Sequence, residues 1–406
     1  MSKPWILLCP SSRGIGHALT RHLLRTTNLP ILATTRTRDP EETKAALLKD
    51  LHHQSSFSGS ASDRASSASA TGPGVTGSSQ FSDSSSSDTY PYPSPPEFSS
   101  DTASSTAGTP ESSASASSSP SSPSSSSRSR NQSSLSDPLD RSSSSSSFQS
   151  PNHQSQSPSS SSASQANEEK DFSSRLHLLP LDVCHESSIL SAAEHAASLF
   201  PPSTHHLHLA FALPGILHPE KSPQQVDYEH ALDTYRVNCL GPLMLMKHFG
   251  NFLPRRQTEM DLSWHPVGLS SSSGISQELD DQEKHREKMR LPPHATWVNM
   301  SARVGSVSDN KSGGWYSYRS SKAAVNSLTK SFDHQLQSRS GGKAMCVGYH
   351  PGTVKTDLSK EFWDSVQNDK IWEPEEAVGH MARVVGGLGQ EQRGRIWDWK
   401  GEEVLP

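Results

Sequence analysis

The sequence is poor in the residues that build membrane spans and export signals. Hydrophobic residues make up only 31% of its 406 positions, against about 45–50% in an average globular domain. No apolar run reaches the roughly 18 residues that cross a bilayer. The amino-terminal residues also lack the small-residue cleavage site of a secretory signal. We therefore expect neither a membrane span nor export.

Cysteine and excess positive charge are also scarce. The chain has 4 cysteines, none in Cys-x-x-Cys spacing, and a formal net charge of −5. Scattered cysteines indicate reduced thiols and a cytoplasmic location. Because no basic stripe with interleaved aromatics is present, we expect no nucleic-acid partner. His205, His206 and His208 lie close together without a Cys, Asp or Glu beside them, so we predict no metal site.

Two polar segments explain the low hydrophobic content. Residues 54–166 are mostly Ser with Pro, Gly, Asn and Gln, a composition that cannot form a core, so this segment is predicted to be disordered. A second polar stretch, 255–293, is predicted to be a smaller insertion. The remaining residues, 1–53, 167–254 and 294–406, are enough for one α/β domain of roughly 250 residues.

Strand and helix patterns alternate through these three remaining segments. Short apolar runs such as 5–9, typical of parallel strands buried on both faces, are separated by stretches with helical periodicity such as 17–25. This alternation predicts a single Rossmann-like domain. Its sheet would be doubly wound and parallel, with ligands at the carboxyl ends of the strands.

A glycine turn connects the first predicted strand to the first predicted helix. Arg13, Gly14, Ile15 and Gly16 make this turn. In such a position, backbone N–H groups and the helix N-terminus can hold a phosphate. An ordinary βα turn that uses glycine for positive φ would give the same pattern.

Arg36 follows the second predicted strand, about 20 residues after the glycine turn. In nucleotide-binding βαβ units an acidic residue there binds a ribose 2′-OH, whereas an arginine accommodates a 2′-phosphate. Arg36 and Arg13 therefore favour NADP(H). Asp39 is close enough that NAD(H) is not excluded, and Arg36 could also be a solvated residue at a strand end.

Tyr318 and Lys322 stand four residues apart in a predicted helix. This spacing puts both on one helical face, about 6 Å apart along the axis. A nearby ammonium lowers the pKa of a phenol and makes it a usable general acid or base. The Tyr-x-x-x-Lys pattern also arises by chance, but apolar residues continue at helical spacing after it, so the pair is expected to look into a cleft.

Asn238 lies beside Gly241 and Pro242 inside a long helical pattern, 228–252. Asn, Gly and Pro are all unfavourable in a helix interior. The combination predicts a helical irregularity that is retained for a functional reason.

Taken together, these motifs resemble the short-chain dehydrogenase/reductase family and, more narrowly, its C-factor-like (C-signal) branch. The hallmarks of that branch look like the stretches Ser-Ala-Arg-Val-Gly-Ser at 301–306, Gly-Gly-Trp-Tyr-Ser-Tyr-Arg at 313–319 and Gly-Arg-Ile-Trp-Asp-Trp-Lys-Gly at 394–401. The resemblance covers nearly everything outside the two polar segments.

The resemblance implies a role for each matching residue. Tyr318 would donate the proton to a carbonyl, Lys322 would hold the nicotinamide ribose and lower the tyrosine pKa, and Asn238 would support a proton-relay water. The implied cofactor contacts are Arg13, Gly14, Ile15, Gly16, Arg36, Asp182, Val183, Gly215, Lys322, Pro351, Gly352, Val354 and Thr356.

Three departures from the family pattern concern the site. The glycine turn begins Cys-Pro10 instead of Thr-Gly, and proline offers no N–H. The Asn-Asn-Ala-Gly of the family is here Ala-Leu-Pro-Gly at 212–215. Ala302 occupies the position of the serine that binds the substrate carbonyl. Ser301 and Ser306 flank it, and we favour Ser301 as the replacement.

Together with the resemblance, these patterns predict an NADP(H)-dependent oxidoreductase acting on a small carbonyl or alcohol. The resemblance also implies a homodimer or tetramer. The alternative is a non-catalytic nucleotide-responsive signalling or binding protein on the same fold. The substrate region, 355–373, contains Phe362, Trp363 and Trp372, which favours an apolar pocket.

Overall fold

The computed structural model describes residues 1–37, 39–51, 171–263, 289–365 and 371–406. The serine-rich segment predicted over 54–166 lies outside the described residues, as does the middle of the second polar segment.

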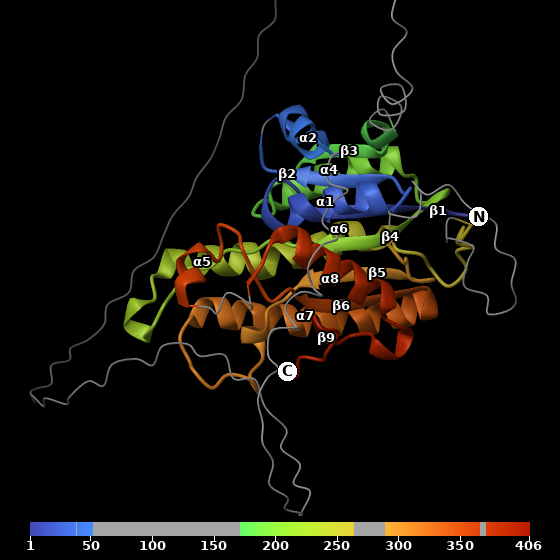
Figure 1. Ribbon diagram of the computed structural model, residues 1–406. Coiled ribbons are helices and arrows are strands. Elements are labelled where there is room, and N and C mark those ends of the chain that lie inside the picture. The colour runs from blue at the N-terminus through green and yellow to red at the C-terminus, as the bar shows by residue number, and fades with distance from the viewer. Residues whose placement is uncertain (38, 52–170, 264–288, 366–370) are drawn as a thin grey trace, which may run out of the picture. The chain divides into compact units, whose positions relative to one another are not determined.

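A seven-stranded parallel sheet forms the centre of the described residues (Figure 1), with the strand order β3-β2-β1-β4-β5-β6-β9. The predicted doubly wound parallel sheet is therefore confirmed. A separate two-stranded ribbon pairs β7 with β8. The strands are β1 (Lys3–Cys9), β2 (Ile31–Thr35), β3 (Leu176–Pro180), β4 (His205–Ala212), β5 (Ala295–Met300), β6 (Ala344–His350), β7 (Thr353–Val354), β8 (Ile371–Trp372) and β9 (Ile396–Asp398).

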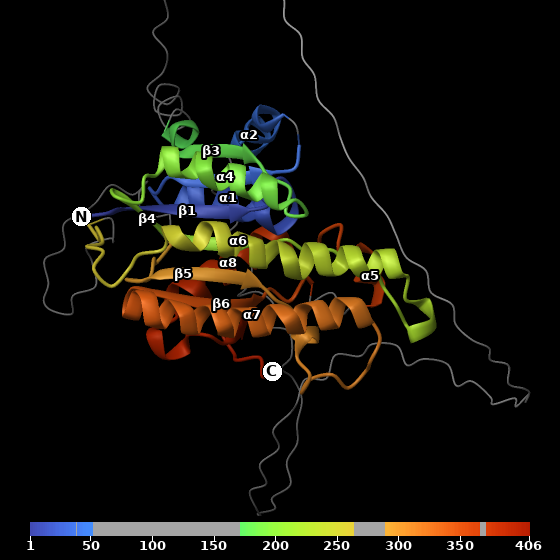
Figure 2. The ribbon, with the colours of Figure 1, turned by 180° about the vertical axis from the view of Figure 1, so that it is seen from behind.

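Helices cover both faces of this sheet. Figure 1 shows α1 and α8 in front of the sheet, and Figure 2, from behind, shows α4, α6 and α7 on the other face. None of the described helices is both long and apolar enough to cross a membrane. The helices are α1 (Gly14–Thr26), α2 (Pro40–Leu48), α4 (Glu186–Leu199), α5 (Tyr228–Tyr235), α6 (Gly241–Phe249), α7 (Tyr316–Ser340) and α8 (Pro374–Gly387).

Strand β1, which lies between β2 and β4, contributes to two hydrophobic cores, one on each face of the sheet. Ile6 and Leu8 join the core beneath α1 and α8, while Trp5 and Leu7 join the core beneath α4, α6 and α7. Successive side chains of a strand point to opposite faces, so a continuous apolar run is what a strand covered on both sides requires.

The irregularity predicted at Asn238 is confirmed. Between α5 and α6 the chain makes a π-helical turn, Arg236–Leu240, and Asn238 is fully buried within it. π-helical turns inside α-helices are rare and are frequent at functional sites. This turn points the Asn238 side chain toward α7.

The described ends of the second polar segment pack on the domain. Ser2 forms a bridge with Met260, and the Lys343 ammonium donates to the Thr258 carbonyl at 2.7 Å. On the other side of the gap, Met289 and Leu291 are buried in the core beneath α1 and α8. The predicted insertion therefore begins and ends with residues anchored to the sheet layers.

Candidate active site

The predicted tyrosine and lysine lie together on the first two turns of α7. Tyr318 is 8% exposed and Lys322 is 2% exposed, and the lysine Nζ lies 5.7 Å from the centroid of the tyrosine ring. The four-residue spacing thus places a phenol and an ammonium side by side at the inner face of the helix.

Burial changes the acid–base properties of this pair. The Lys322 ammonium donates to the Met300 carbonyl at 2.8 Å, at the carboxyl end of β5. Burial lowers the pKa of Lys322 to about 8, because removal from water penalises the charged form. The lysine therefore changes charge in the range where a general acid–base partner is useful.

Asn238 connects α7 to the loop after β4. Its side-chain amide donates to the Ile216 carbonyl at 2.9 Å and to the Ser321 hydroxyl at 3.1 Å, and its oxygen accepts from the Ile216 N–H at 2.8 Å. A Cβ added to Gly215 would lie 3.6 Å from the Lys322 Nζ and 3.9 Å from the Asn238 oxygen. Gly215, Asn238 and Lys322, distant in sequence, therefore meet at one point.

The two candidate hydroxyls beside Ala302 are both engaged. Ser301 is buried and donates to the Asn326 side-chain oxygen at 2.5 Å. The Ser306 hydroxyl accepts from the Asp309 N–H at 3.1 Å. Since a hydroxyl has one proton to donate, the Ser301 proton is directed to Asn326 in this arrangement.

The glycine turn fits a bound phosphate group. A Cβ on Gly16 would lie 2.0 Å from the Pro10 carbonyl oxygen, so only glycine allows the turn to pack this closely on α1. Gly14 has φ +53, and no side-chain hydrogen bond caps α1 among the described residues. The first N–H groups of a helix have no intrahelical partner, which leaves them available to an anion.

The loop after β6 returns to the same turn. A Cβ on Gly14 would lie 3.2 Å from the Thr356 side chain, and the Arg13 guanidinium lies 3.6 Å from the Asp357 carboxylate. Pro351 and Val354 are buried, and Gly352 has φ +77 and faces the indoles of Trp372 and Trp399. These contacts bring the predicted phosphate turn and the predicted nicotinamide loop together.

A further group of predicted cofactor residues lies beyond the end of β2. Arg36 is exposed. Although burial raises the pKa of Asp182, hydrogen bonds from Cys184 and the charges of His185 and Arg36 outweigh it and hold the pKa below its usual value. Val183 packs against Gly241, 3.1 Å from the position of an added Cβ.

The Asp39 carboxylate has a local structural role. It accepts from the N–H groups of Glu41 and Glu42 at 3.0 and 3.4 Å and so caps the amino-terminal end of α2. Asp39 was the reason that NAD(H) could not be excluded from the sequence. Its carboxylate already accepts hydrogen bonds from the protein backbone.

The sequence did not indicate Glu220, which is 3% exposed and holds the start of α7. Its carboxylate accepts from the Ser317 N–H at 2.9 Å and the Ser317 hydroxyl at 2.5 Å. Its carbonyl accepts from the Trp315 N–H at 2.6 Å. Glu220 lies in an irregular loop far from α7 in sequence, so no local pattern connects it to this helix.

The predicted substrate region divides between two places. Phe362 packs against Trp315, with ring centroids 4.9 Å apart, and Trp315 lies 6.2 Å from the Tyr318 ring. Trp372 instead packs on Trp399 at 4.8 Å, behind Gly352. Of the three predicted aromatics, Phe362 is therefore connected to Tyr318 through one intervening ring.

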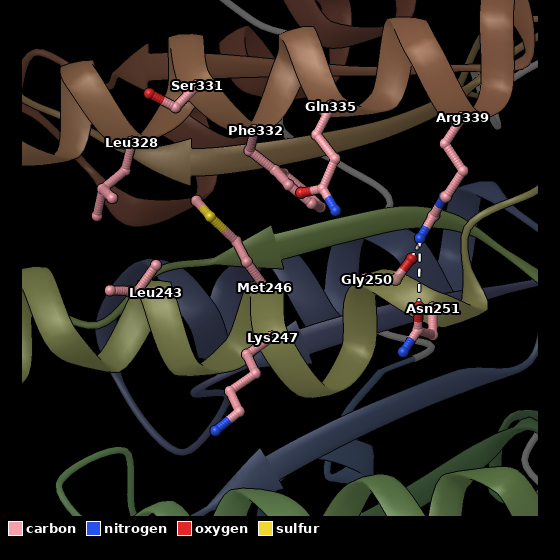
Figure 3. Close-up of a pocket in the computed structure, with 10 residues that line it drawn as sticks. All are labelled: Leu243, Met246, Lys247, Gly250, Asn251, Leu328, Ser331, Phe332, Gln335 and Arg339. Carbon is pink, nitrogen blue, oxygen red and sulfur yellow. Dashed lines mark hydrogen bonds between the residues drawn. The ribbon is translucent and has the colours of Figure 1, made fainter.

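A separate groove of about 410 Å³ lies between α6 and α7 (Figure 3). No residue predicted for the active site lines it. The Arg339 guanidinium reaches across it and donates to the Gly250 carbonyl at 2.6 Å. The lining residues are Leu243, Met246, Lys247, Gly250, Asn251, Leu328, Ser331, Phe332, Gln335 and Arg339.

His206 and His208 of β4 form hydrogen bonds within the protein. His206 hydrogen-bonds the Ser2 hydroxyl at 3.1 Å, and His208 bonds the Pro292 carbonyl at 3.0 Å. Within the described ranges, no group of three or more His, Cys, Asp and Glu side chains is arranged to hold a metal ion.

Comparison with known proteins gives relatives for this arrangement. No protein-family model matches the chain. It is 35% identical over 179 residues to C-signal of Myxococcus xanthus, covering 44% of this chain and 80% of that protein. It is 41% identical over 97 residues to 1-hydroxy-2-glutathionyl-2-methyl-3-butene dehydrogenase of Rhodococcus sp., covering 24% of this chain and only 40% of that protein.

Solved structures agree on the fold. The carbonyl reductase Sniffer of D. melanogaster superposes with a TM-score of 0.52 at 18% identity, covering 100% of both chains. At that identity the likeness establishes the fold alone. The match to C-signal extends over most of that protein at 35% identity, which is high enough to establish the family. The chain belongs to the short-chain dehydrogenase/reductase family, in its C-factor-like (C-signal) branch.

Proposed function

We propose that the protein is an NADP(H)-dependent oxidoreductase that interconverts a small carbonyl compound and its alcohol. The observation that carries this proposal is the buried pair on α7, in which the Lys322 Nζ lies 5.7 Å from the centroid of the Tyr318 ring, next to Asn238 and Gly215. The C-signal relationship and the carbonyl reductase fold support the reaction class.

The residues present fit the cofactor. Gly14, Ile15 and Gly16 would hold its pyrophosphate with backbone N–H groups at the start of α1. Arg13 and Arg36 would bind the 2′-phosphate, and the engagement of Asp39 as a helix cap favours NADP(H) over NAD(H). The remaining proposed contacts are Asp182, Val183, Gly215, Pro351, Gly352, Val354 and Thr356.

The proposed chemistry is acid–base assistance of hydride transfer. When bound, NADPH supplies the hydride to the carbonyl carbon. Tyr318 donates its proton to the carbonyl oxygen, and Lys322 lowers the tyrosine pKa and donates hydrogen bonds to the ribose. Asn238 is held by Ile216 and Ser321, which orients it to support a water that returns the proton. Ser301 is proposed to bind the carbonyl, which requires its hydroxyl to turn from Asn326.

A binding protein without catalysis is the second candidate. It is favoured by Ala302, which has no hydroxyl, and by the engagement of the Ser301 proton with Asn326. The two candidates differ in turnover and not in cofactor binding.

One experiment separates these functions. NADPH and NADH are titrated into the full chain by calorimetry, and NADPH oxidation is then followed with a panel of aldehydes and ketones. We expect tighter binding of NADPH than NADH, and carbonyl-dependent oxidation. Binding without oxidation across the panel would favour the non-catalytic candidate, and the absence of dinucleotide binding would contradict both. A homodimer or tetramer, expected from the resemblance, stays a prediction for sedimentation analysis.

A further inference from the structure

The turn before α7 has an unusual backbone. Gly313, Gly314 and Trp315 have φ values of +64, +68 and +49, all in the left-handed region. Glycine adopts this region freely, but a bulky residue such as tryptophan rarely does. A left-handed tryptophan persists only where surrounding contacts hold it, and such residues gather at functional sites.

Several contacts hold this turn. The Glu220 main-chain carbonyl accepts from the Trp315 N–H at 2.6 Å, and the Glu220 carboxylate accepts from the Ser317 N–H at 2.9 Å and the Ser317 hydroxyl at 2.5 Å. The Arg319 guanidinium donates to the Gly313 and Gly314 carbonyls, each at 3.1 Å. Glu220 therefore joins the residue before the helix to the residue beside Tyr318.

The held conformation places the Trp315 ring between two other aromatic rings. It meets Tyr318 at 6.2 Å with an interplanar angle of 83°, and Phe362 at 4.9 Å with an angle of 57°. Both Trp315 and Phe362 are only half-buried, so each keeps accessible ring surface. Edge-to-face and tilted contacts at these distances are the favourable aromatic geometries.

We propose that Trp315 determines specificity, selecting carbonyl compounds that carry a planar aromatic substituent, and that Glu220 is the positioning residue that holds it. This inference rests on the proposed function, because it takes Tyr318 as the group that meets the carbonyl oxygen. A substituent on a carbonyl at Tyr318 lies beside Trp315 and Phe362. A planar aromatic substituent extends their edge-to-face contacts, and a saturated ring of the same size lacks the quadrupole that favours them.

The test compares two ketones of the same carbon skeleton, acetophenone and cyclohexyl methyl ketone. Each is titrated by calorimetry into the full chain in the presence of NADP⁺, which prevents reduction. The wild type is expected to bind acetophenone about five- to tenfold more tightly than cyclohexyl methyl ketone. Trp315→Ala is expected to bring this ratio close to one, while Trp315→Phe keeps most of it. Equal affinity of the wild type for both ketones, or an unchanged ratio in Trp315→Ala, would overturn the proposal.

The role of Glu220 is tested on the same ratio. Glu220→Ala keeps the main-chain carbonyl and removes the carboxylate that holds Ser317, two residues after Trp315. It is expected to lower the preference without changing NADP⁺ affinity. The double variant Glu220→Ala/Trp315→Ala is expected to lose no more than Trp315→Ala alone, because the carboxylate acts on the position of Trp315. The exposed Glu229 on α5 gives the matched control, Glu229→Ala. Additive losses in the double variant would overturn the positioning role.

Turnover of the wild type with NADPH is recorded separately. Preference for acetophenone without turnover would contradict the proposed oxidoreductase and support the role of Trp315 in selecting aromatic substituents. Turnover without preference for acetophenone would contradict the role of Trp315 and support the oxidoreductase.

Discussion

A lysine ammonium is costly to keep charged inside a protein, and Lys322 is a fully buried one whose pKa falls to about 8. Its ammonium donates to the Met300 carbonyl at 2.8 Å, a neutral acceptor that offsets the burial less than a carboxylate would. The residue thus lowers stability while providing the charge that the proposed chemistry needs. Functional residues often lower the stability of the protein in this way.

Replacement of Lys322 by Met is expected to stabilise the protein and abolish turnover. A pKa that falls from 10.5 to about 8 corresponds to about 3 kcal/mol against the charged form. Loss of the bond to the Met300 carbonyl offsets about 1–2 kcal/mol of that. We expect a net gain of about 1–2 kcal/mol in the free energy of unfolding at pH 7, measured by urea denaturation.

The pH dependence of this gain follows from the lowered pKa. Below pH 8 both the folded and the unfolded wild type carry the charge, so the penalty is fully present. Between about pH 8 and 10.5 the unfolded state binds the proton more tightly, so wild-type stability rises relative to the variant. The advantage of Lys322→Met should therefore shrink across this range, and a gap that does not change with pH would contradict the account.

Ala302 gives the second prediction for a single residue. Ala302→Ser is expected to raise kcat/KM for carbonyl reduction at least about tenfold, because a donor aimed at developing negative charge on oxygen commonly contributes that much or more. Ser301, which donates to Asn326, is the comparison. Ser301→Ala is expected to lower kcat/KM, because Ser301 is the proposed carbonyl donor. An unchanged kcat/KM in Ala302→Ser would show that a hydroxyl at position 302 does not assist the reaction and that this prediction is wrong.

At the scale of elements, the contact between α7 and the loop after β5 fixes where the proposed catalytic pair lies relative to that loop. A Cβ on Gly305 would lie 2.8 Å from both the Lys322 carbonyl carbon and the Lys322 Cβ, distances that side chains do not tolerate. The loop carrying Ala302 can therefore approach α7 only because residue 305 is glycine.

Gly305→Ala is expected to destabilise the protein by about 1–3 kcal/mol and to lower kcat, since it displaces Lys322. The matched control is Gly379→Ala on α8, where an added Cβ meets no atom within 4 Å and a gain of about 0.4–1 kcal/mol is expected. Denaturation and turnover are measured on both variants. Equal effects of the two substitutions would show that the contact with Lys322 is unimportant.

The elements were more predictable from the sequence than their contacts. The apolar run of β1 and the Asn238 irregularity follow from local pattern alone, and both are confirmed. The cap by Asp39 was not predicted, although Pro40 follows it at the first position of a helix, where proline is common. Glu220 was not predictable, since its carboxylate meets Ser317 only once the loop after β4 and α7 have docked on one sheet.

The same limit applies to the site. Tyr318 and Lys322 are four residues apart, so helical geometry alone predicts their contact. The approach of Thr356 to Gly14 and of Gly215 to Lys322 depends on the order of strands in the sheet. The family resemblance named these four residues as cofactor contacts but predicted neither pair, and spacing alone gave no signal for them.

At the scale of the whole molecule, buried histidines link stability to pH. His206 and His294 are 1% and 4% exposed. Burial lowers the pKa of each to about 4. Both lie at the edge of the sheet where β4 and β5 begin, away from the proposed site.

These histidines predict acid destabilisation of the whole domain. The unfolded state binds their protons near pH 6.5 and the folded state only near 4, so the stability from the neutral form is present above pH 6.5 and is lost as pH falls toward 4. We expect a loss on the order of 1–3 kcal/mol for each histidine, followed by urea denaturation between pH 7 and 4. His206→Gln should reduce this slope, and an unchanged slope in that variant would contradict the assignment.

The central claim is that one phenol, Tyr318, supplies the proton, and a neighbouring phenol provides the control. Tyr316 begins α7 and is 42% exposed, with Ser320 and not a lysine four residues on. The most direct measurement is carbonyl-dependent NADPH oxidation by Tyr318→Phe and Tyr316→Phe, with NADPH affinity measured on both. We predict that Tyr318→Phe lowers kcat at least about a hundredfold with NADPH affinity retained, while Tyr316→Phe turns over like the wild type. Wild-type rates in Tyr318→Phe on a working substrate would contradict the account.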